Sequence, residues 1–424
     1  MKLEIIGGRL IDPSQGLDRE TDLYVEDGRI LALGERPAGF VADRTIQAQG
    51  CLVTPGFVDL CAALRSKLNA RMATELKAAV KGGITSVCCP PDGSPINDTA
   101  AVTSLLREQA RDLHLARVFP VGALTQGLQG EQLSEMFGLK AAGCQMVTNM
   151  RRPLGNNRIL RRCLEYARTQ DLTVGFCPED YSLAVDGCVN EGFTGTRLGL
   201  NGIPAVAETL AVAEALLLTE DTGVRAHFFQ ISTARSVELI AQAQQRGLPV
   251  TADVAIHQLL LTDSVLDSFD SSYHLHPPLR TERDRDALRQ GVRDGVIQAI
   301  CSQHQPLELA DKQAPFAETV PGMIGLETLL PLTLQLVEEG VLELQRAIEA
   351  LTVGPARVMG LELGTLEPGR PADISVIDPE CQWVLTEKTL LSACKNTPFL
   401  NQSLTGQVRY TLVDGRLVYE AESK

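Results

Sequence analysis

The sequence lacks the features of a membrane or exported protein. No apolar run reaches the length of about 18 residues that a membrane-spanning helix needs. The first segment, MKLEIIGGRLIDPSQG, has only a short apolar stretch and no small-residue cleavage site. It therefore predicts a first β-strand and not a signal peptide. We expect a protein without membrane segments.

Basic residues and paired cysteines are also scarce. Lys and Arg number 39 against 53 Asp and Glu, which leaves a net charge of −14 and a pI near 5.0. This acidity disfavours nucleic acid and anionic membrane surfaces as partners. The 11 cysteines include no CxxC pair, and only Cys88 and Cys89 are adjacent. Such scattered thiols are typical of reduced cysteines in a cytoplasmic protein and not of a disulfide framework.

Common catalytic and nucleotide-binding motifs are absent as well. There is no GxSxG segment, and Ser232-Thr233 predicts the N-terminal cap of the helix ARSVELIAQAQQ instead of a nucleophile. The GxGxxG and Walker lysine motifs are missing, and glycines such as Gly82-Gly83 fit helix ends that precede strands. These absences argue against a serine hydrolase and indicate no nucleotide site.

Both ends of the chain carry short strand patterns. Residues 2–50 alternate apolar or β-branched runs with turns, including Asp27-Gly28, and the same texture returns in PADISVIDPE and in VRYTLVDGRLVYE with its Asp414-Gly415. An Asp-Gly pair between two strand patterns predicts a tight hairpin. Two β-rich ends around one long centre indicate a single small β-rich domain built from residues 1–52 and 362–424.

The centre, residues 53–361, alternates short apolar strands with amphipathic helices. This alternation predicts βαβ units and a parallel sheet. Eight strands with helices between them indicate an α/β fold of the (β/α)8 TIM-barrel type. The strands are expected near Val53–Leu60, Ile84–Cys89, Ala116–Val121, Cys144–Thr148, Leu172–Phe176, Val224–Phe229, Leu248–Ala252 and Val296–Cys301.

In a barrel of this type, catalytic groups follow the C-terminal ends of the strands. At these positions the sequence offers two separated thiols, several amides and one histidine, which is a poor donor set because amide oxygens bind zinc weakly. A rearranged zinc site at Cys61, Cys177 and His304 is one alternative, and buried reduced thiols are the simpler interpretation. The strand-end residues are Cys61, Ala63, Asn149, Met150, Cys177, Gln230, Gln303 and His304.

Other histidines are weaker candidates. His257, in TADVAIHQLLL, is a candidate ligand or base, yet a single histidine at a strand end is more often structural. His274 and His276, in YHLHPPLR, have HxH spacing, but Pro277-Pro278 places them in a loop with no partner histidine nearby in sequence.

Nine segments, taken in order, resemble one known family. In their order and spacing they are similar to bacterial dihydroorotases of the amidohydrolase superfamily, across nearly the whole chain. The resemblance implies a metal-bearing (β/α)8 barrel with a β-rich domain formed by both termini. The segments are PGFVDL followed by LR, KGGITSVCCPPDGSPIND, LEYARTQDLTV, CPEDYSLA, ISTARSVELI, HPPLRTERDRDAL, PFAETVPGMIGLETLLPL, PGRPADISVIDP and KNTPF.

The resemblance also implies that metal ligands have been replaced after the first and fourth strands. The family's D-x-H-x-H-x-R segment has Cys61 and Ala63 where its two zinc-binding histidines stand, while Asp59 remains. Arg65 remains too and matches the family's carboxylate-binding arginine. The bridging aspartate after the fourth strand is replaced by Asn149, and the neighbouring residues provide no carboxylate.

Further replacements follow at the later strands. Two more ligand histidines of the family become Cys177 and Gln230. The catalytic aspartate becomes Gln303, and a glutamine cannot act as a general base at neutral pH. Two substrate-holding asparagines of the family become Asp92 and His276, and a carboxylate at the first of these positions would oppose an anionic substrate.

The resemblance thus implies a catalytically inactive dihydroorotase-like subunit with no metal or other cofactor. Inactive chains of this kind assemble with the catalytic chain of aspartate transcarbamoylase in bacterial pyrimidine biosynthesis. That chain is therefore the expected partner, with a homodimer of this protein inside a larger hetero-oligomer.

Two other functions stay open at this point. The first is a divergent metal-dependent cyclic amidase that uses the rearranged zinc site at Cys61, Cys177 and His304. The second is a ligand-sensing module in which the pocket around Arg65 still binds an anionic metabolite.

Overall fold

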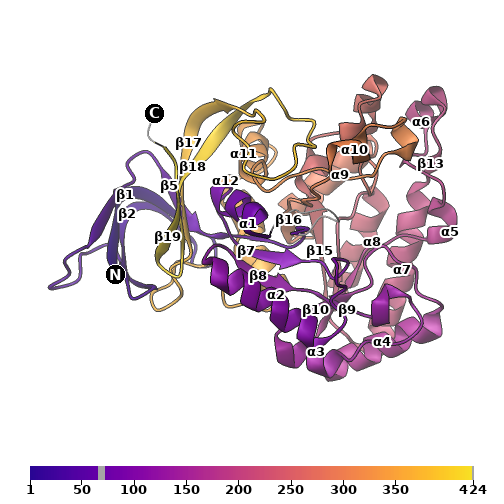
Figure 1. Cartoon of the computed structure of the whole chain (residues 1–424), viewed down its shortest axis with the longest axis horizontal. Helices are drawn as coiled ribbons and strands as arrows, with labels where there is room; N and C mark the ends of the chain where they lie inside the picture. The colour runs from indigo at the N-terminus through magenta and orange to yellow at the C-terminus, as the bar shows by residue number, and fades with distance from the viewer. Residues whose placement is uncertain (65–71, 423–424) are drawn as a thin grey trace.

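The computed structural model describes residues 1–64 and 72–422 of the chain. It places an eight-stranded sheet beside a (β/α)8 barrel (Figure 1). The sheet contains strands from both ends of the chain, and the barrel is formed by the residues between them. The predicted α/β fold, a TIM barrel with a β-rich part from both termini, is confirmed.

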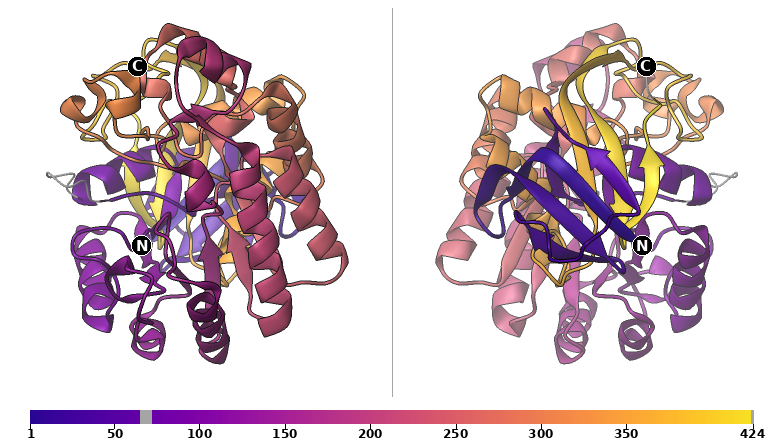
Figure 2. Two further views of the ribbon diagram at one scale, coloured as in Figure 1. Left: turned by 90° about the vertical axis from the view of Figure 1, so that its right-hand side faces the viewer. Right: turned by 90° about the vertical axis from the view of Figure 1, so that its left-hand side faces the viewer.

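The β-rich part is one mixed sheet with the order β19-β18-β17-β5-β1-β2-β3, and β4 pairs with β1 off this path. β5 pairs parallel to β1 and antiparallel to β17, so it joins the N-terminal strands to the C-terminal ones. The right-hand view of Figure 2 shows the indigo and yellow strands side by side. The strands are β1 (Lys2–Asp12), β2 (Leu17–Glu26), β3 (Arg29–Leu33), β4 (Arg44–Gln47), β5 (Leu52–Pro55), β17 (Ile374–Val384), β18 (Ser403–Val413) and β19 (Arg416–Glu420).

The two Asp-Gly turns form hairpins, as their sequence predicts. Asp27 and Gly28 have φ of +50° and +80°, and Asp414 and Gly415 have φ of +49° and +68°, the left-handed pair that a tight two-residue hairpin requires. The turns also pack against each other. A Cβ atom on Gly28 would lie 2.8 Å from the carbonyl oxygen of Asp414, and one on Gly415 would lie 2.8 Å from the Cα of Gly28. Only glycine fits at either position.

The barrel strands run parallel in two ladders, β6-β7-β8 and β9-β10-β11-β14-β15-β16. Backbone contacts after the last and first strands close the ring: Ala63 N–H donates to the His304 carbonyl at 2.9 Å, and His304 N–H donates to the Cys61 carbonyl at 3.2 Å. The strands are β6 (Phe57–Asp59), β7 (Ile84–Cys89), β8 (Arg117–Pro120), β9 (Gly122–Ala123), β10 (Met146–Thr148), β11 (Thr173–Phe176), β14 (Ala226–Phe228), β15 (Val250–Ala255) and β16 (Ala299–Cys301).

The first predicted barrel strand, Val53–Leu60, is two strands in the structure. Its first part is β5, which belongs to the eight-stranded sheet, and only β6 belongs to the barrel. The chain changes sheets at Gly56, where a Cβ atom would lie 2.2 Å from a methyl carbon of Thr85. The β-rich sheet therefore extends to Pro55, beyond the boundary predicted at residue 52.

Helices surround the barrel, and short elements form an excursion after β11 (Figure 1). Among the residues that the structure describes, no helix has both the length and the apolar character needed to cross a membrane. The main helices are α1 (Met72–Lys81), α2 (Ala100–Leu113), α3 (Met136–Ala142), α4 (Asn157–Thr169), α7 (Ala205–Thr222), α8 (Ala234–Gln245), α9 (Glu282–Arg293), α11 (Leu329–Glu338), α12 (Leu344–Leu351) and α13 (Val353–Val358). The short elements of this excursion are α5 (Tyr181–Ala184), β12 (Val189–Asn190), α6 (Phe193–Leu198) and β13 (Gly202–Ile203), and the short helix α10 (Leu309–Lys312) follows β16.

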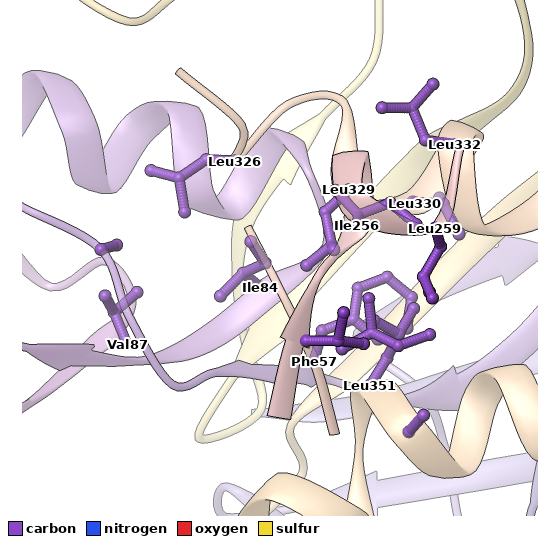
Figure 3. Packing of buried hydrophobic residues seen from close by; sticks show 14 of the residues in the cluster. Phe57, Ile84, Val87, Ile256, Leu259, Leu326, Leu329, Leu330, Leu332 and Leu351 are labelled. Carbon is purple, nitrogen blue, oxygen red and sulfur yellow. The ribbon is translucent and has the colours of Figure 1, made fainter. Parts of the chain in front are cut away.

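One large apolar cluster contains side chains from both parts of the molecule, and the β-rich sheet also has a smaller cluster of its own. Figure 3 shows Phe57 of β6 packed near Leu351 of α12, within a buried cluster that also contains Leu329 of α11. The same cluster includes Leu404 and Val408 of β18. The sheet is therefore held against the barrel by burial of apolar side chains, which supplies roughly 25 cal/mol for each Å² removed from water.

Candidate functional site

The C-terminal ends of the barrel strands bring most of the predicted positions together. Asp59, at the end of β6, joins the first and last strands, because its Oδ1 accepts the Ser302 backbone N–H at 2.9 Å and its Oδ2 accepts the Ser302 hydroxyl. Burial raises the pKa of Asp59 to about 6, while these hydrogen bonds act in the opposite direction. The Asp59 carboxylate therefore holds the ends of the first and last barrel strands together. Arg65, the predicted substrate arginine, lies outside the described residues.

The two predicted thiols lie in one apolar cluster with Phe229 and Met146. Burial raises the pKa of Cys61 well above its usual range, and it raises the pKa of Cys177 to about 12. Nearby carboxylates, Asp253 among them, raise both pKa values further. Because the thiolate is the form that binds metal or attacks carbon, neither cysteine is suited to either task at neutral pH.

The two predicted glutamines hydrogen-bond to each other. Gln303 Nε2 donates to Gln230 Oε1 at 2.8 Å and to the His276 carbonyl at 2.8 Å. Arg151 donates to the same Gln230 oxygen at 2.9 Å. Both glutamines have a φ of +48°, a strained backbone conformation that clusters at functional sites. The backbone thus keeps an active-site shape while the side chains are neutral amides, and Gln230 Nε2 is buried with no hydrogen-bond partner among the described residues.

The predicted substrate-holding position at His276 is occupied by a protein group. Its Nε2 lies 2.7 Å from Glu179 Oε2. Burial and the charge of Arg151 lower the pKa of His276, although Glu179 opposes this. Burial raises the pKa of Asp92, on the loop after β7, and the charges of Arg152 and Arg151 offset this only in part. At both positions, charged groups of the protein itself therefore act on the side chain.

Two further predicted positions make local contacts. Asn149 is buried, with its Oδ1 accepting the Thr125 hydroxyl at 2.7 Å and its Nδ2 donating to the Arg152 carbonyl at 3.2 Å. Ala63 contributes its backbone N–H to the closure of the barrel. Neither residue presents a metal donor to the mouth, because the amide oxygen of Asn149 is already in use.

His304 is turned away from the two cysteines. Its Nε2 lies 2.9 Å from Glu75 Oε2 on α1, and its Nδ1 accepts the Gly325 backbone N–H at 3.1 Å. The imidazole is fully buried and both of its nitrogens are hydrogen-bonded. The rearranged zinc site at Cys61, Cys177 and His304 is therefore wrong. The histidine after the last strand holds α1 against the barrel instead.

The donor set does not fit the zinc that the family resemblance implies. Among the described residues, no group of three or more His, Cys, Asp or Glu is arranged to hold a metal ion. The undescribed segment 65–71 has the sequence RSKLNAR, which contains none of these residue types. A catalytic zinc needs three anionic or imidazole ligands and an open position. The thiols, amides and occupied imidazoles here cannot supply them.

Several residues of the mouth were not singled out in the sequence. Asp253 is buried inside the barrel, where its Oδ1 accepts the Gln230 backbone N–H at 2.6 Å and its Oδ2 lies 3.1 Å from His227 Nε2. Its alternation along the strand TADVA was a signal that it points inward. Arg151 lies three residues beyond the end of β10, and Glu179 lies two residues beyond Cys177, but the contacts that they make do not follow from sequence spacing.

His257 is a buried histidine without a hydrogen-bond partner on either ring nitrogen among the described residues. Burial lowers its pKa to about 4. The unfolded chain therefore takes up a proton below pH about 6.5, while the folded protein does not do so until about 4, so stability falls as the pH falls through this range. We expect this histidine alone to make the free energy of unfolding about 2 kcal/mol smaller at pH 5 than at pH 7.

Urea unfolding of the His257→Leu variant at both pH values measures this contribution. Between pH 7 and pH 5, the free energy of unfolding is expected to fall by about 2 kcal/mol less in the variant than in the unaltered protein. His114→Asn is the matched control, because His114 is exposed and has a φ of +51° that asparagine tolerates. Equal pH dependence in His257→Leu and the unaltered protein would contradict the prediction.

Comparisons with known proteins agree with this geometry. The Amidohydrolase family matches residues 190–418, and the Dihydro-orotase-like family matches residues 50–236. Dihydroorotase-like proteins of Pseudomonas aeruginosa and Pseudomonas putida are each 50% identical to the chain, over 423 and 425 residues, which is 99% and 100% of this chain and 100% of both relatives.

A solved structure shares the fold. The L-hydantoinase (dihydropyrimidinase) of Arthrobacter aurescens superposes with a TM-score of 0.88 at 24% sequence identity, covering 99% of this chain and 96% of that one. At this identity the likeness concerns the fold alone. Taken with the full-length relatives, these matches show that the chain belongs to the amidohydrolase family, among its dihydroorotase-like proteins.

Proposed function

We propose that the protein is a catalytically inactive dihydroorotase-like subunit that assembles with the catalytic chain of aspartate transcarbamoylase. The observation that carries the proposal is the hydrogen-bonded group of Gln230, Gln303 and Arg151 at the barrel mouth. These side chains stand where the family has a zinc ligand and a general base. Neutral amides cannot take a proton from water or lower its pKa.

The intact helix caps, turns and barrel closure support a structural role. Thr281 and Asp284 form a complete capping box at the start of α9, and Thr233 caps α8. The barrel is closed, and both hairpin turns keep their glycines. Local and global features therefore agree throughout the molecule, as they do in chains that must fold to be useful. Selection for the fold without selection for the reaction accounts for both observations.

Exposed apolar side chains on α7 fit a chain that works inside an assembly. Val206, Leu210 and Leu217 are 53%, 48% and 67% exposed. Their spacings of four and seven residues place them on one helix face. Apolar side chains exposed along one helix face are suited to contact with another protein. In the proposed complex, dimers of this protein link catalytic trimers of the transferase.

The test is to produce the transcarbamoylase catalytic chain with and without this protein and to measure mass by light scattering and carbamoyl transfer by product formation. We expect the two chains to elute together at a mass above that of either alone. We also expect the transferase to lose assembly or activity when this protein is omitted. An unrelated acidic TIM-barrel protein serves as the control for nonspecific association. A transferase that assembles and works equally well alone, with no complex formed, would overturn the proposal.

A further inference from the structure

A cavity lies at the opposite end of the barrel from the mouth. It has a volume of about 1040 Å³ and is bounded by the two Asp-Gly hairpin turns and by the C-terminal part of α2. β8 begins at this end, so the cavity lies at the N-terminal ends of the strands. It is therefore separate from the barrel mouth and from the function proposed above. Its charged lining is Arg29, Arg44, Arg107, Arg111, Arg117, Arg416, His114, Asp27 and Asp414.

The charge of this lining is opposite to that of the chain. The protein carries a net charge of −14, yet six arginines face two aspartates here. Two of the arginines are paired: Arg44 binds Glu420 with two hydrogen bonds of 2.7 and 2.8 Å, and Arg117 pairs with Asp373 and Asp414. The lining of the cavity thus carries more positive than negative groups, although the chain as a whole is acidic.

Four arginines of the cavity have no carboxylate partner among the described residues. Arg29 donates to the Gly369 carbonyl at 2.7 Å, and Arg107 donates to the Ala142 carbonyl at 2.6 Å. Arg416 contacts His114 Nδ1 at 3.2 Å. Arg111 is exposed in the last turn of α2, where it also suits the helix dipole. Arg29 and Arg416 lie on the hairpins, so an interaction with the helix dipole does not account for their presence in the cavity.

The walls of the cavity are held firmly. Arg117 reaches across to both Asp373 and Asp414, and the Asp414 N–H donates to Asp373 Oδ1 at 2.9 Å. The contact between Gly28 and Gly415 fixes the two hairpin turns against each other. The backbone that carries Arg29 and Arg416 is therefore set in place before any ligand arrives, which lowers the entropy lost on binding.

We propose that this cavity binds a polyphosphate-bearing metabolite through its unpaired arginines. Guanidinium groups hydrogen-bond phosphate oxygens in pairs, and several of them around one cavity suit a ligand with two or more phosphates. The volume is that of a site for a molecule of nucleotide size. A second cavity of about 610 Å³ adjoins it through Arg29, Arg117 and Phe119, and provides an aromatic wall for an organic group.

The sequence gives no warning of this site, because its arginines come from separate segments of the chain. Arg29 and Arg44 lie near one terminus, Arg416 near the other, and Arg107 and Arg111 on a barrel helix. The site has no glycine-rich phosphate loop. It depends on the sheet that both ends of the chain form together.

The test is calorimetric titration with tripolyphosphate, ATP and inorganic phosphate, without divalent metal, at about 0.15 M salt, where the screening length of about 8 Å suppresses long-range attraction. We expect tripolyphosphate and ATP to bind at one site per chain, and phosphate to bind at least tenfold more weakly. A much higher affinity for ATP than for tripolyphosphate would show that the site recognises a nucleotide. Equal affinities would show that it recognises the phosphate chain itself. Absence of binding by both at millimolar concentration would overturn the proposal.

Paired variants locate the site. Arg111→Ser combined with Arg416→Ser is expected to weaken binding at least tenfold, because both guanidinium groups line the cavity. The matched control is Arg158→Ser combined with Arg162→Ser, since these arginines are exposed on α4 and removing them changes the net charge equally. A urea unfolding curve for each pair confirms that it folds. Equal weakening in both pairs would mean nonspecific attraction and would also overturn the proposal.

Discussion

The purified protein is expected to convert dihydroorotate at no measurable rate above the blank, with or without added zinc. Replacing a general base by an amide such as Gln303 removes a factor of up to about 10⁴. Without a bound metal, the attacking water also keeps a pKa near 15.7 in place of about 7. The rate should therefore lie at least about 10⁴-fold below that of a dihydroorotase with intact motifs. Spectrophotometric assay in both directions of the ring-opening reaction measures this.

The matching measurement is metal content. We expect less than about 0.1 zinc ion per chain after dialysis, because the Cys61 and Cys177 thiols are protonated and His304 is occupied. A dihydroorotase with the D-x-H-x-H segment, prepared and dialysed in the same way, is the positive control. One zinc per chain that survives dialysis, together with turnover, would show that the protein is an enzyme after all.

The Glu75→Ala substitution is expected to cost about 3–5 kcal/mol of unfolding free energy. It leaves the buried His304 Nε2–H and the Ala393 backbone N–H without acceptors. Burial alone would raise the pKa of Glu75, but hydrogen bonds from His304 and Ala393 help to lower it overall. The stabilisation from this carboxylate is therefore present above its unfolded pKa of about 4.5 and is lost as the pH falls below it.

Urea unfolding at pH 7 measures the loss, and Glu108→Ala on α2 is the control because Glu108 is exposed. The control is expected to change the unfolding free energy by less than about 0.5 kcal/mol. A loss below about 1 kcal/mol in Glu75→Ala would show that His304 does not depend on this contact.

The sequence predicts the local structure well. The Asp-Gly turns, the Thr233 cap and the Thr281–Asp284 box all form as their residue types predict. The order of strands also places the strand-end residues at one barrel mouth, because parallel strands end on the same side. These features depend on neighbours in sequence or on a regular repeat, so spacing is sufficient to find them.

Contacts between distant segments could not be predicted in this way. His304 and Glu75 are 229 residues apart, and nothing in either segment shows that the imidazole turns towards α1 and away from the cysteines. The change of sheet at Gly56 depends on the approach of Thr85, which is visible only once the strands are packed. The arginines that line the cavity at the N-terminal ends of the barrel strands likewise meet only in the folded chain.

The sheet shared by the two chain ends sets the order in which the molecule can be completed during synthesis. β5 is made early, but its partner β17 leaves the ribosome only after the whole barrel has been translated. Until then β5 offers an open edge of hydrogen-bonding groups and apolar side chains. Nascent chains and products of premature termination therefore carry a surface prone to association with other chains.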